Sequence, residues 1–183
     1  FFALQEADMS VPRFDGATEE RVYRAGFLGT DASIVLPYDP SRDRVLLVEQ
    51  FRFGPFLRDD PNPWLMEPIA GRVDVGETAE AAAMRETHEE SGLALRALHK
   101  VHSGYASPGC STEYFNIYVG IADIDDNAAI LGGLESESED LQGYIFSFSD
   151  FIELLQSGQL PVVPLALAGY WLALNRNELR KNS

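Results

Sequence analysis

The sequence predicts a mixed α/β protein, in which helices pack on a mixed or largely antiparallel sheet. Short apolar stretches bounded by turn residues indicate strands on both sides of a central helical stretch, and two further helical stretches end the chain. With 183 residues, the chain can bury one sizeable core. We therefore expect one globular domain built as a layered sandwich.

The expected strands follow from alternating or continuous apolar residues. The turn DPSRD at 39–43 makes the second and third strands a hairpin, whereas the proline-rich and charged stretch 58–63 predicts a surface loop. The predicted strands are 19–25, 32–38, 44–53, 65–69, 95–105, 112–121 and 143–148.

Three helices are expected from capping residues and apolar periodicity. Thr78 is placed as the N-cap of a helix over 79–91, which Gly92 ends. Ser149 is placed as the cap of a short helix over 150–156. The last helix, 165–180, carries apolar residues all round its first half, so we expect it to be largely buried.

Composition restricts the possible partners. The formal charge of −15 disfavours nucleic acid and anionic membranes, so a phosphate-bearing ligand must be small and accompanied by cations. The sequence contains no apolar run long enough to span a bilayer. Cys110 is the single cysteine, which excludes an internal disulfide and predicts a reducing, cytoplasmic location.

The central helix raises a chemical problem, because it places Glu86, Glu89 and Glu90 on one side. Like charges at this spacing repel one another, and a divalent cation between them would remove that cost. The alternative is a solvated acidic helix in which Arg85 pairs with Glu89.

The spacing of Gly71, Glu77 and the stretch RETHEESGL at 85–93 resembles the signature of the Nudix hydrolases, a loop-helix-loop that binds divalent metal and a diphosphate. The resemblance implies a Nudix α/β/α sandwich with a mixed sheet around this central metal-binding segment. Thr87 departs from the usual aliphatic residue, and we expect it to face the core.

Mg²⁺ prefers hard oxygen ligands, and the resemblance implies Mg²⁺ as cofactor, with Mn²⁺ as a substitute. The implied metal ligands are the Ala70 carbonyl, Glu86, Glu89 and Glu90, and Glu89 is also placed among the catalytic residues. Structural roles are implied for Gly71, Glu77 and Arg85, with Arg85 paired to Glu77.

Four further segments resemble the ADP-ribose pyrophosphatases and related nucleoside-diphosphate-sugar hydrolases. They are LPYDP, VEQFR, PWLMEPIAG and ASPGCSTE, the last containing Pro108. The resemblance implies hydrolysis of ADP-ribose to AMP and ribose 5-phosphate. Two alternatives stay open: the same chemistry on GDP-mannose or another sugar nucleotide, and a module that binds ADP-ribose without cleaving it.

A mobile acidic loop supplies the general base in the enzymes that this chain resembles. The stretch LESESEDL at 134–141 lies at that place, and we assign Glu137 as the base and Glu139 as a further metal ligand. Glu135 and Glu139 remain alternatives for the base, and a purely solvated loop is the competing interpretation.

Several charged or polar residues outside the signature are candidates for substrate binding. Arg52 is a candidate for phosphate binding and Arg24 for contact with a phosphate or the base, although each could be a surface ion-pair partner. By resemblance, Glu113 accepts hydrogen bonds from ribose hydroxyls, Ser107 contributes at the same site, and Glu67 supports the metal or orients substrate.

The N-terminal segment is considered separately. We divide the chain into an N-terminal strand segment, 1–30, for dimerisation or substrate binding, and a hydrolase domain, 31–183. In the dimeric enzymes that the chain resembles, an aromatic residue of this segment crosses to the partner subunit and stacks on adenine. Phe1, beside Phe2, is placed in that role, and a homodimer is implied. Because the sequence starts without Met, we expect residues upstream of Phe1.

Overall fold

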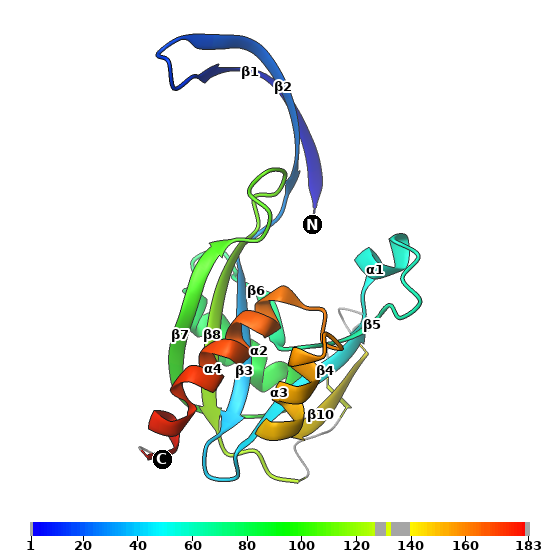
Figure 1. The fold of residues 1–183 in the computed structure, drawn as a ribbon, viewed down its shortest axis with the longest axis vertical. Coiled ribbons are helices and arrows are strands. Elements are labelled where there is room, and N and C mark those ends of the chain that lie inside the picture. The colour runs from blue at the N-terminus through cyan, green and yellow to red at the C-terminus, as the bar shows by residue number, and fades with distance from the viewer. Residues whose placement is uncertain (1, 127–130, 133–139, 182–183) are drawn as a thin grey trace.

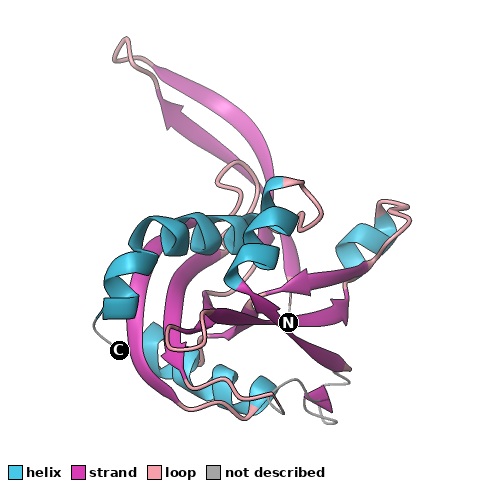
Figure 2. Cartoon of the chain, turned by 60° about the horizontal axis from the view of Figure 1, so that its bottom comes forward, coloured by secondary structure: helices cyan, strands magenta, loops and turns pink. Residues whose placement is uncertain are grey.

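The computed structural model describes residues 2–126, 131–132 and 140–181. Its body has three layers, with helix α2 on one face of the main sheet and helices α3 and α4 on the other (Figures 1 and 2). The predicted mixed α/β sandwich is therefore confirmed.

The main sheet is mixed, because β3 pairs with β8 in parallel while the other pairs are antiparallel. The strand order is β7-β8-β3-β4-β10-β9, with β5 paired to β4 and β6 to β3, and β1 and β2 form a separate two-stranded sheet. The strands are β1 (Ala3–Pro12), β2 (Thr18–Leu28), β3 (Ala32–Asp39), β4 (Arg44–Phe51), β5 (Trp64–Glu67), β6 (Ile69–Arg72), β7 (Leu95–Tyr105), β8 (Tyr114–Ala122), β9 (Leu131–Gly132) and β10 (Leu141–Ser147). The helices are α1 (Phe53–Leu57), α2 (Ala79–Ser91), α3 (Phe148–Gln156) and α4 (Val163–Lys181).

Strand β3 shows how the two faces of the sheet are filled. Alternate side chains of a strand point to opposite faces. Ile34, Leu36 and Tyr38 join the core that includes residues of α3 and α4, while Val35 joins Ala83 of α2 and Tyr118 on the other side. Helices on both sides explain why this strand reads as a continuous apolar run.

Helix α2 has the bounds that the sequence predicts. The Thr78 side chain accepts a hydrogen bond from the Ala81 N–H, and Gly92 adopts the left-handed conformation with φ 69°. Its buried side chains include Ala82, Ala83 and Thr87, which are small. The Thr87 hydroxyl donates to the Ala83 carbonyl, so its polar group is satisfied within the core, where the sequence analysis placed it.

The observed elements differ from the prediction where proline changes the backbone pairing. The expected strand 65–69 is two strands, β5 on β4 and β6 on β3, separated by Pro68, which has no N–H for a ladder.

The expected strand 44–53 ends at Phe51, and the short helix α1 follows at once. Neither α1 nor strand β1 was among the predicted elements.

The C-terminal predictions also need correction. Ser147, not Ser149, caps α3, because its hydroxyl accepts the Asp150 N–H and the helix starts two residues earlier than expected. Helix α4 buries only one side, with Leu165, Ala168 and Leu172 in the core. Its apolar first half also exposes Val163, Leu167 and Tyr170. None of the helices in the described ranges is long and apolar enough to cross a membrane.

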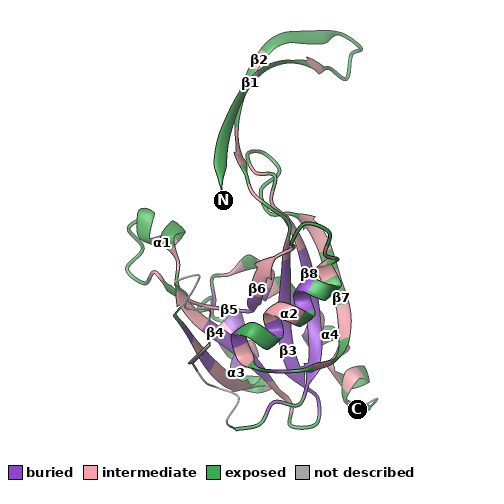
Figure 3. Cartoon of the chain, turned by 180° about the vertical axis from the view of Figure 1, so that it is seen from behind, coloured by how far each residue is buried: buried purple, intermediate pink, exposed green. Residues whose placement is uncertain are grey.

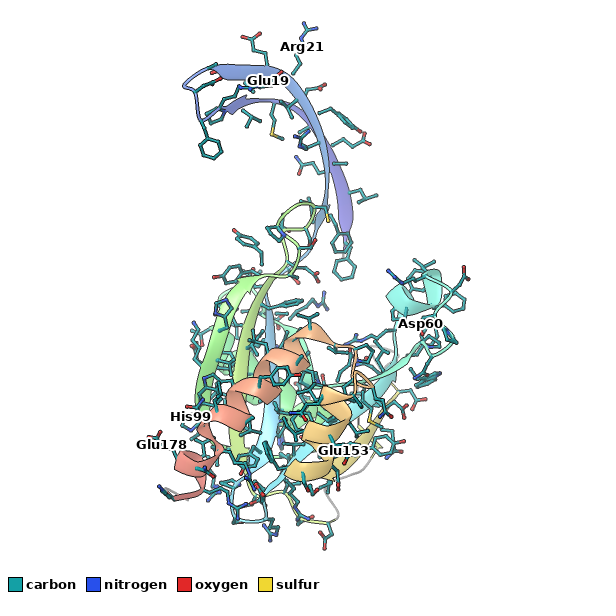
Figure 4. The ribbon with its side chains drawn as sticks, in the orientation of Figure 1. Glu19, Arg21, Asp60, His99, Glu153 and Glu178 are labelled. Carbon is teal, nitrogen blue, oxygen red and sulfur yellow. The ribbon has the colours of Figure 1, made fainter. Side chains whose placement is uncertain are left out.

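The hairpin of β1 and β2 extends away from the body (Figures 1 and 3). Its root is tied to the loop before β8, since the Phe27 N–H donates to the Cys110 carbonyl over 2.7 Å and the Thr112 N–H donates to the Phe27 carbonyl over 3.0 Å. At its far end, Arg21 points away from the body (Figure 4), and Glu19 accepts a hydrogen bond from Arg13 over 2.6 Å.

An ion-pair cluster joins α4 to the turn between β3 and β4. Asp43, with φ 57°, receives hydrogen bonds from the Arg176 guanidinium and from the Tyr38 hydroxyl, and Arg180 Nη1 lies 2.6 Å from its Oδ2. Burial would raise the pKa of Asp43, but the hydrogen bonds from Arg176 and Tyr38 outweigh it and lower that pKa.

Replacing Asp43 with Ala should lower the free energy of unfolding by about 2 kcal/mol more than replacing Asp59 with Ala. Asp59 is the matched control, because its φ is also 57° but it is exposed and forms no ion pair with the described residues. Both variants therefore carry the backbone strain, and only one loses the cluster. Urea unfolding at neutral pH measures the difference, and equal losses would contradict the assignment.

The sign of the pH dependence follows from the lowered pKa of Asp43. Its stabilisation is complete above the pKa of the unfolded chain and is lost as the pH falls through the native pKa. The stability gap between the wild type and Asp43→Ala should therefore narrow below about pH 4.

Candidate active site

Glu86 on α2 lies directly against Gly71 on β6. A Cβ atom built on Gly71 would lie 1.8 Å from Glu86 Cδ and 1.9 Å from Oε1, so the carboxylate occupies the space that any other side chain would need. The small buried residues of α2 permit this approach. Residue 71 must therefore be glycine for Glu86 to keep this position.

Arg85 holds the helix and the preceding loop together. Its guanidinium donates to both oxygens of Glu77, through Nε over 3.1 Å and through Nη2 over 3.0 Å, and Nη2 also donates to the Arg72 carbonyl. Nη1 donates to Glu86 over 2.7 Å and to Glu89 over 3.0 Å. The Glu77 pair implied by the resemblance is present, and so is the Glu89 pair of the alternative interpretation.

The electrostatics follow from this arrangement. Hydrogen bonding to Glu77 is the largest cause that raises the pKa of Arg85, with Glu86 and Glu89 adding to it. Hydrogen bonds from Arg85 in turn lower the pKa of Glu77. The guanidinium therefore stays charged and offsets the repulsion among the carboxylates.

The three signature glutamates differ in burial. Glu90 is 4% exposed, whereas the side chains of Glu86 and Glu89 are 15% and 33% exposed. Oxygen donors of this kind suit Mg²⁺ or Mn²⁺, and a buried carboxylate such as Glu90 needs a compensating charge or hydrogen bonds. The space left for Glu86 by Gly71 also fits a metal ligand fixed in place. In the described part of the chain, no three His, Cys, Asp or Glu side chains are already gathered in a metal-binding arrangement.

A cavity of about 270 Å³ lies beside this cluster. It is lined by residues from β3, from β4 to β6, from the loop before β8 and from the start of α4. They include Arg52, Glu67, Ala70, Gly71, Glu113, Val162 and Pro164. Four predicted site residues, Ala70, Arg52, Glu67 and Glu113, are thus brought to one cavity with the signature glycine.

Arg52 and Glu67 form an ion pair inside this cavity. Arg52 Nε donates to Glu67 Oε2 over 2.5 Å. Burial is the largest influence on Glu67 and raises the pKa of its carboxyl group, while the charge and hydrogen bond of Arg52 act in the opposite direction. The sequence analysis treated these two residues independently, and the structure places them in contact.

Other predicted residues lie elsewhere. Arg24 is exposed on β2, and its Nη1 donates to the Tyr23 carbonyl. Arg24 and Pro108 line a separate hollow between the hairpin and the loop before β8. Ser107 Oγ lies 3.4 Å from Cys110 Sγ in the same loop. The structure of a single chain does not bring these residues into the cavity.

Four candidate residues, Phe1, Glu135, Glu137 and Glu139, lie outside the described residues. Phe2, next to Phe1, packs its ring against Phe27 with the ring centroids 4.9 Å apart. Aromatic contact is therefore present at the N-terminus of the hairpin, within one chain.

Gly29 is a residue that the sequence analysis missed. A Cβ atom on Gly29 would lie 2.3 Å from Glu113 Cγ, and Gly29 exchanges two hydrogen bonds with the Thr112 hydroxyl. It thereby leaves room for the Glu113 side chain at the cavity. Gly29 and Glu113 are 84 positions apart in the sequence. A glycine between two strands carries no local signal of so distant a contact.

Comparison with known proteins places the chain in a family. A model of the NUDIX domain matches residues 28–166. The chain belongs to the NUDIX domain family. The match covers the main sheet, α2, and the loop that carries Glu113, so the signature and the cavity both lie within the family's domain.

Curated relatives cover nearly the whole NUDIX chain. The ADP-ribose pyrophosphatase of Escherichia coli (strain K12) is 33% identical over 180 residues, which are 98% of this chain and 85% of the relative. That of Haemophilus influenzae is 32% identical over 184 residues, 100% of this chain and 84% of the relative. The GDP-mannose pyrophosphatase of Cronobacter sakazakii is 29% identical over 158 residues, 86% of this chain and 81% of the relative.

A solved structure supports the fold. The crystal structure of an ADP compounds hydrolase superposes with a TM-score of 0.68 at 20% identity, covering 98% of this chain and 89% of that chain. The fold shared with that structure therefore extends over nearly the whole chain, including the layers that position the cavity.

Replacing Gly71 with Ala should weaken the affinity for Mn²⁺ by about 10- to 100-fold, because the new methyl group displaces the Glu86 carboxylate. Gly54→Ala is the control, since a Cβ atom on Gly54 would meet nothing within 4 Å. Calorimetric titration with Mn²⁺ measures the affinity, and thermal unfolding checks that both variants are folded. Unchanged affinity in folded Gly71→Ala would remove Glu86 from the ligand set.

Proposed function

We propose that this protein is a Mg²⁺-dependent hydrolase, with Mn²⁺ as a substitute, that splits the diphosphate of ADP-ribose into AMP and ribose 5-phosphate. The observation that carries the proposal is the fixed position of Glu86 against Gly71, beside a cavity that holds Arg52 and Glu113. Relatives named ADP-ribose pyrophosphatase support it, because they align over 98% or more of the chain.

Each part of the site has a task in this proposal. Glu86, Glu89, Glu90 and the Ala70 carbonyl would hold the metal, which when bound neutralises charge on the diphosphate and makes a water more acidic. Arg85 keeps the loop and helix in register by its bonds to Glu77. Arg52 has a planar fork of donors suited to a phosphate.

The attack on phosphorus needs a base that takes a proton from water. We propose Glu137 for this role, with Glu139 as a further metal ligand; Glu89 stays a second catalytic candidate, and Glu135 an alternative base. The loop follows β8 in sequence and precedes β10, which lies beside β4 in the sheet. In-line hydrolysis by water needs no covalent enzyme intermediate.

The rest of the substrate would contact residues of the loop before β8 and the N-terminal segment. We propose that Glu113 and Ser107 bind ribose hydroxyls, and that Arg24 and Phe1 bind the adenosine part from a partner subunit. The hairpin supports a homodimer, because it exposes apolar residues and a two-stranded sheet alone is marginally stable. The exposed apolar residues of the hairpin are Phe2, Leu4, Met9, Phe14, Tyr23 and Leu28.

This proposal divides the chain at residue 30, with segment 1–30 serving dimerisation and substrate binding and 31–183 forming the hydrolase domain. The hairpin supports the division, because β1 and β2 pair only with each other in the described sheets. The free, exposed Cys110 is consistent with the proposed cytoplasmic location.

GDP-mannose is the second candidate substrate. Relatives named GDP-mannose pyrophosphatase align over 86% and 87% of the chain, at 29% and 28% identity. Both candidates share the diphosphate, so they make the same demands on Arg52 and the signature carboxylates. The two substrates differ in the base and the sugar, whose contacts would be separate from those with the diphosphate.

Purified protein should release AMP from ADP-ribose in Mg²⁺ with a higher kcat/KM than it releases GMP from GDP-mannose. EDTA should abolish both activities. Glu86→Gln and Glu90→Gln should each lower kcat by at least about 100-fold, because each removes a charged metal ligand. Chromatography of the products measures all three effects.

Glu80→Gln is the control for the loss of an acidic residue from the same helix. Glu80 lies in the first turn of α2, where it accepts a hydrogen bond from the Tyr118 hydroxyl over 3.2 Å. Full activity in Glu86→Gln and Glu90→Gln would contradict the metal assignment. Faster release of GMP than of AMP would keep the chemistry and change the substrate.

A further inference from the structure

In the ion pair between Arg52 and Glu67, the carboxylate engages one edge of the guanidinium and leaves the other edge accessible. Arg52 Nε donates a hydrogen bond to Glu67 Oε2 over 2.5 Å. Within the described residues, the Arg52 side chain makes no other hydrogen bond. Both Nη groups of the guanidinium therefore remain for a ligand. The Arg52 side chain is 39% exposed, while that of Glu67 is 12% exposed.

The backbone fixes where the two side chains start. Arg52 directly follows β4, and its N–H donates to the Pro63 carbonyl over 2.8 Å. Glu67 ends β5, whose pairing with β4 sets Glu67 opposite Val48. The pair therefore spans two hydrogen-bonded strands, and the guanidinium cannot move away from the cavity without leaving the carboxylate.

Charge argues against direct contact between Glu67 and the substrate. A diphosphate is anionic, so a neighbouring carboxylate would repel it unless a cation lies between them. Arg52 is such a cation, and it lines the same cavity as Glu67 and Gly71. A guanidinium has several edges, and one can bind a carboxylate while another binds a phosphate.

We propose that Glu67 is a positioning residue, which holds the Arg52 guanidinium so that its Nη groups face the substrate diphosphate. This inference rests on the proposed function and assigns Glu67 a task through Arg52, without contact to substrate. A carboxylate that is already desolvated orients a donor without a further cost when the ligand enters. Loss of Glu67 would free the Arg52 side chain to adopt other rotamers.

A double-mutant cycle in ligand binding tests this proposal. The affinity for ADP-ribose is measured by calorimetry in EDTA, where no metal supports turnover, for Glu67→Ala, Arg52→Ala and the double variant. Glu67→Ala should raise Kd by about tenfold, the size expected for a charge-assisted hydrogen bond that is no longer oriented. In the Arg52→Ala background, the same change should alter Kd by less than about twofold, because the residue through which Glu67 acts is gone.

Two further variants separate position from charge. Glu67→Gln keeps an acceptor for Arg52 Nε and should raise Kd by only about threefold. Glu49→Gln removes one charge from the neighbouring part of β4, outside the cavity, where Glu49 accepts a hydrogen bond from the Tyr144 hydroxyl. It should bind ADP-ribose like the wild type.

The outcomes distinguish this inference from the proposed function. Equal and additive losses in the cycle, or wild-type affinity in Glu67→Ala, would overturn the positioning role. Failure of the wild type to bind ADP-ribose would overturn it as well, because Arg52 would then have no such ligand. Binding with the expected cycle but without turnover in Mg²⁺ would overturn only the hydrolase proposal.

Discussion

The placement of one guanidinium among three carboxylates is the constraint on which the candidate site depends. Arg85 bonds to Glu77 in the loop and to Glu86 and Glu89 on its own helix. Glu86 and Glu89, which lie about one turn apart on α2, would otherwise repel each other. Because the same side chain also donates to the Arg72 carbonyl, it joins the end of β6, the loop and α2 into one unit.

Packing explains why this unit reaches the cavity. Helix α2 offers small residues to the sheet, so its axis can approach β6 closely enough for Glu86 to lie over Gly71. Larger apolar residues fill the opposite face, where Phe151, Leu165 and Leu172 cover β3. Both faces of the sheet are therefore packed with apolar residues, and the small residues of α2 set how closely its carboxylates approach β6.

Two elements lie outside this packed body, the hairpin and α1 (Figure 3). Helix α1 has no buried residues, and Phe53 and Phe56 stack with ring centroids 6.1 Å apart while remaining exposed. Exposed apolar residues that lie together often mark an interaction surface. It is consistent with the proposed homodimer, in which such surface would be covered.

Local chemistry made much of this structure predictable. Thr78 and Gly92 could be recognised as the two ends of α2, because capping depends on neighbouring backbone groups. The spacing of the signature glutamates was predictable because it is a property of one helix. Errors arose where several local solutions were similar in sequence. Ser147 and Ser149 both resemble caps, and the partner exchange at Pro68 depends on strands distant in sequence.

By itself, the sequence determined the sandwich class, the central helix and the set of carboxylates, since these follow from periodicity, capping and spacing. Only the tertiary structure decided that Arg52 pairs with Glu67 and that Gly29 makes room for Glu113. It also decided that Arg52, Glu67 and Glu113 share one cavity with Gly71. The physical reason is that each contact joins strands or loops brought together by sheet pairing. The residues next to each partner in the sequence therefore give no indication of the contact.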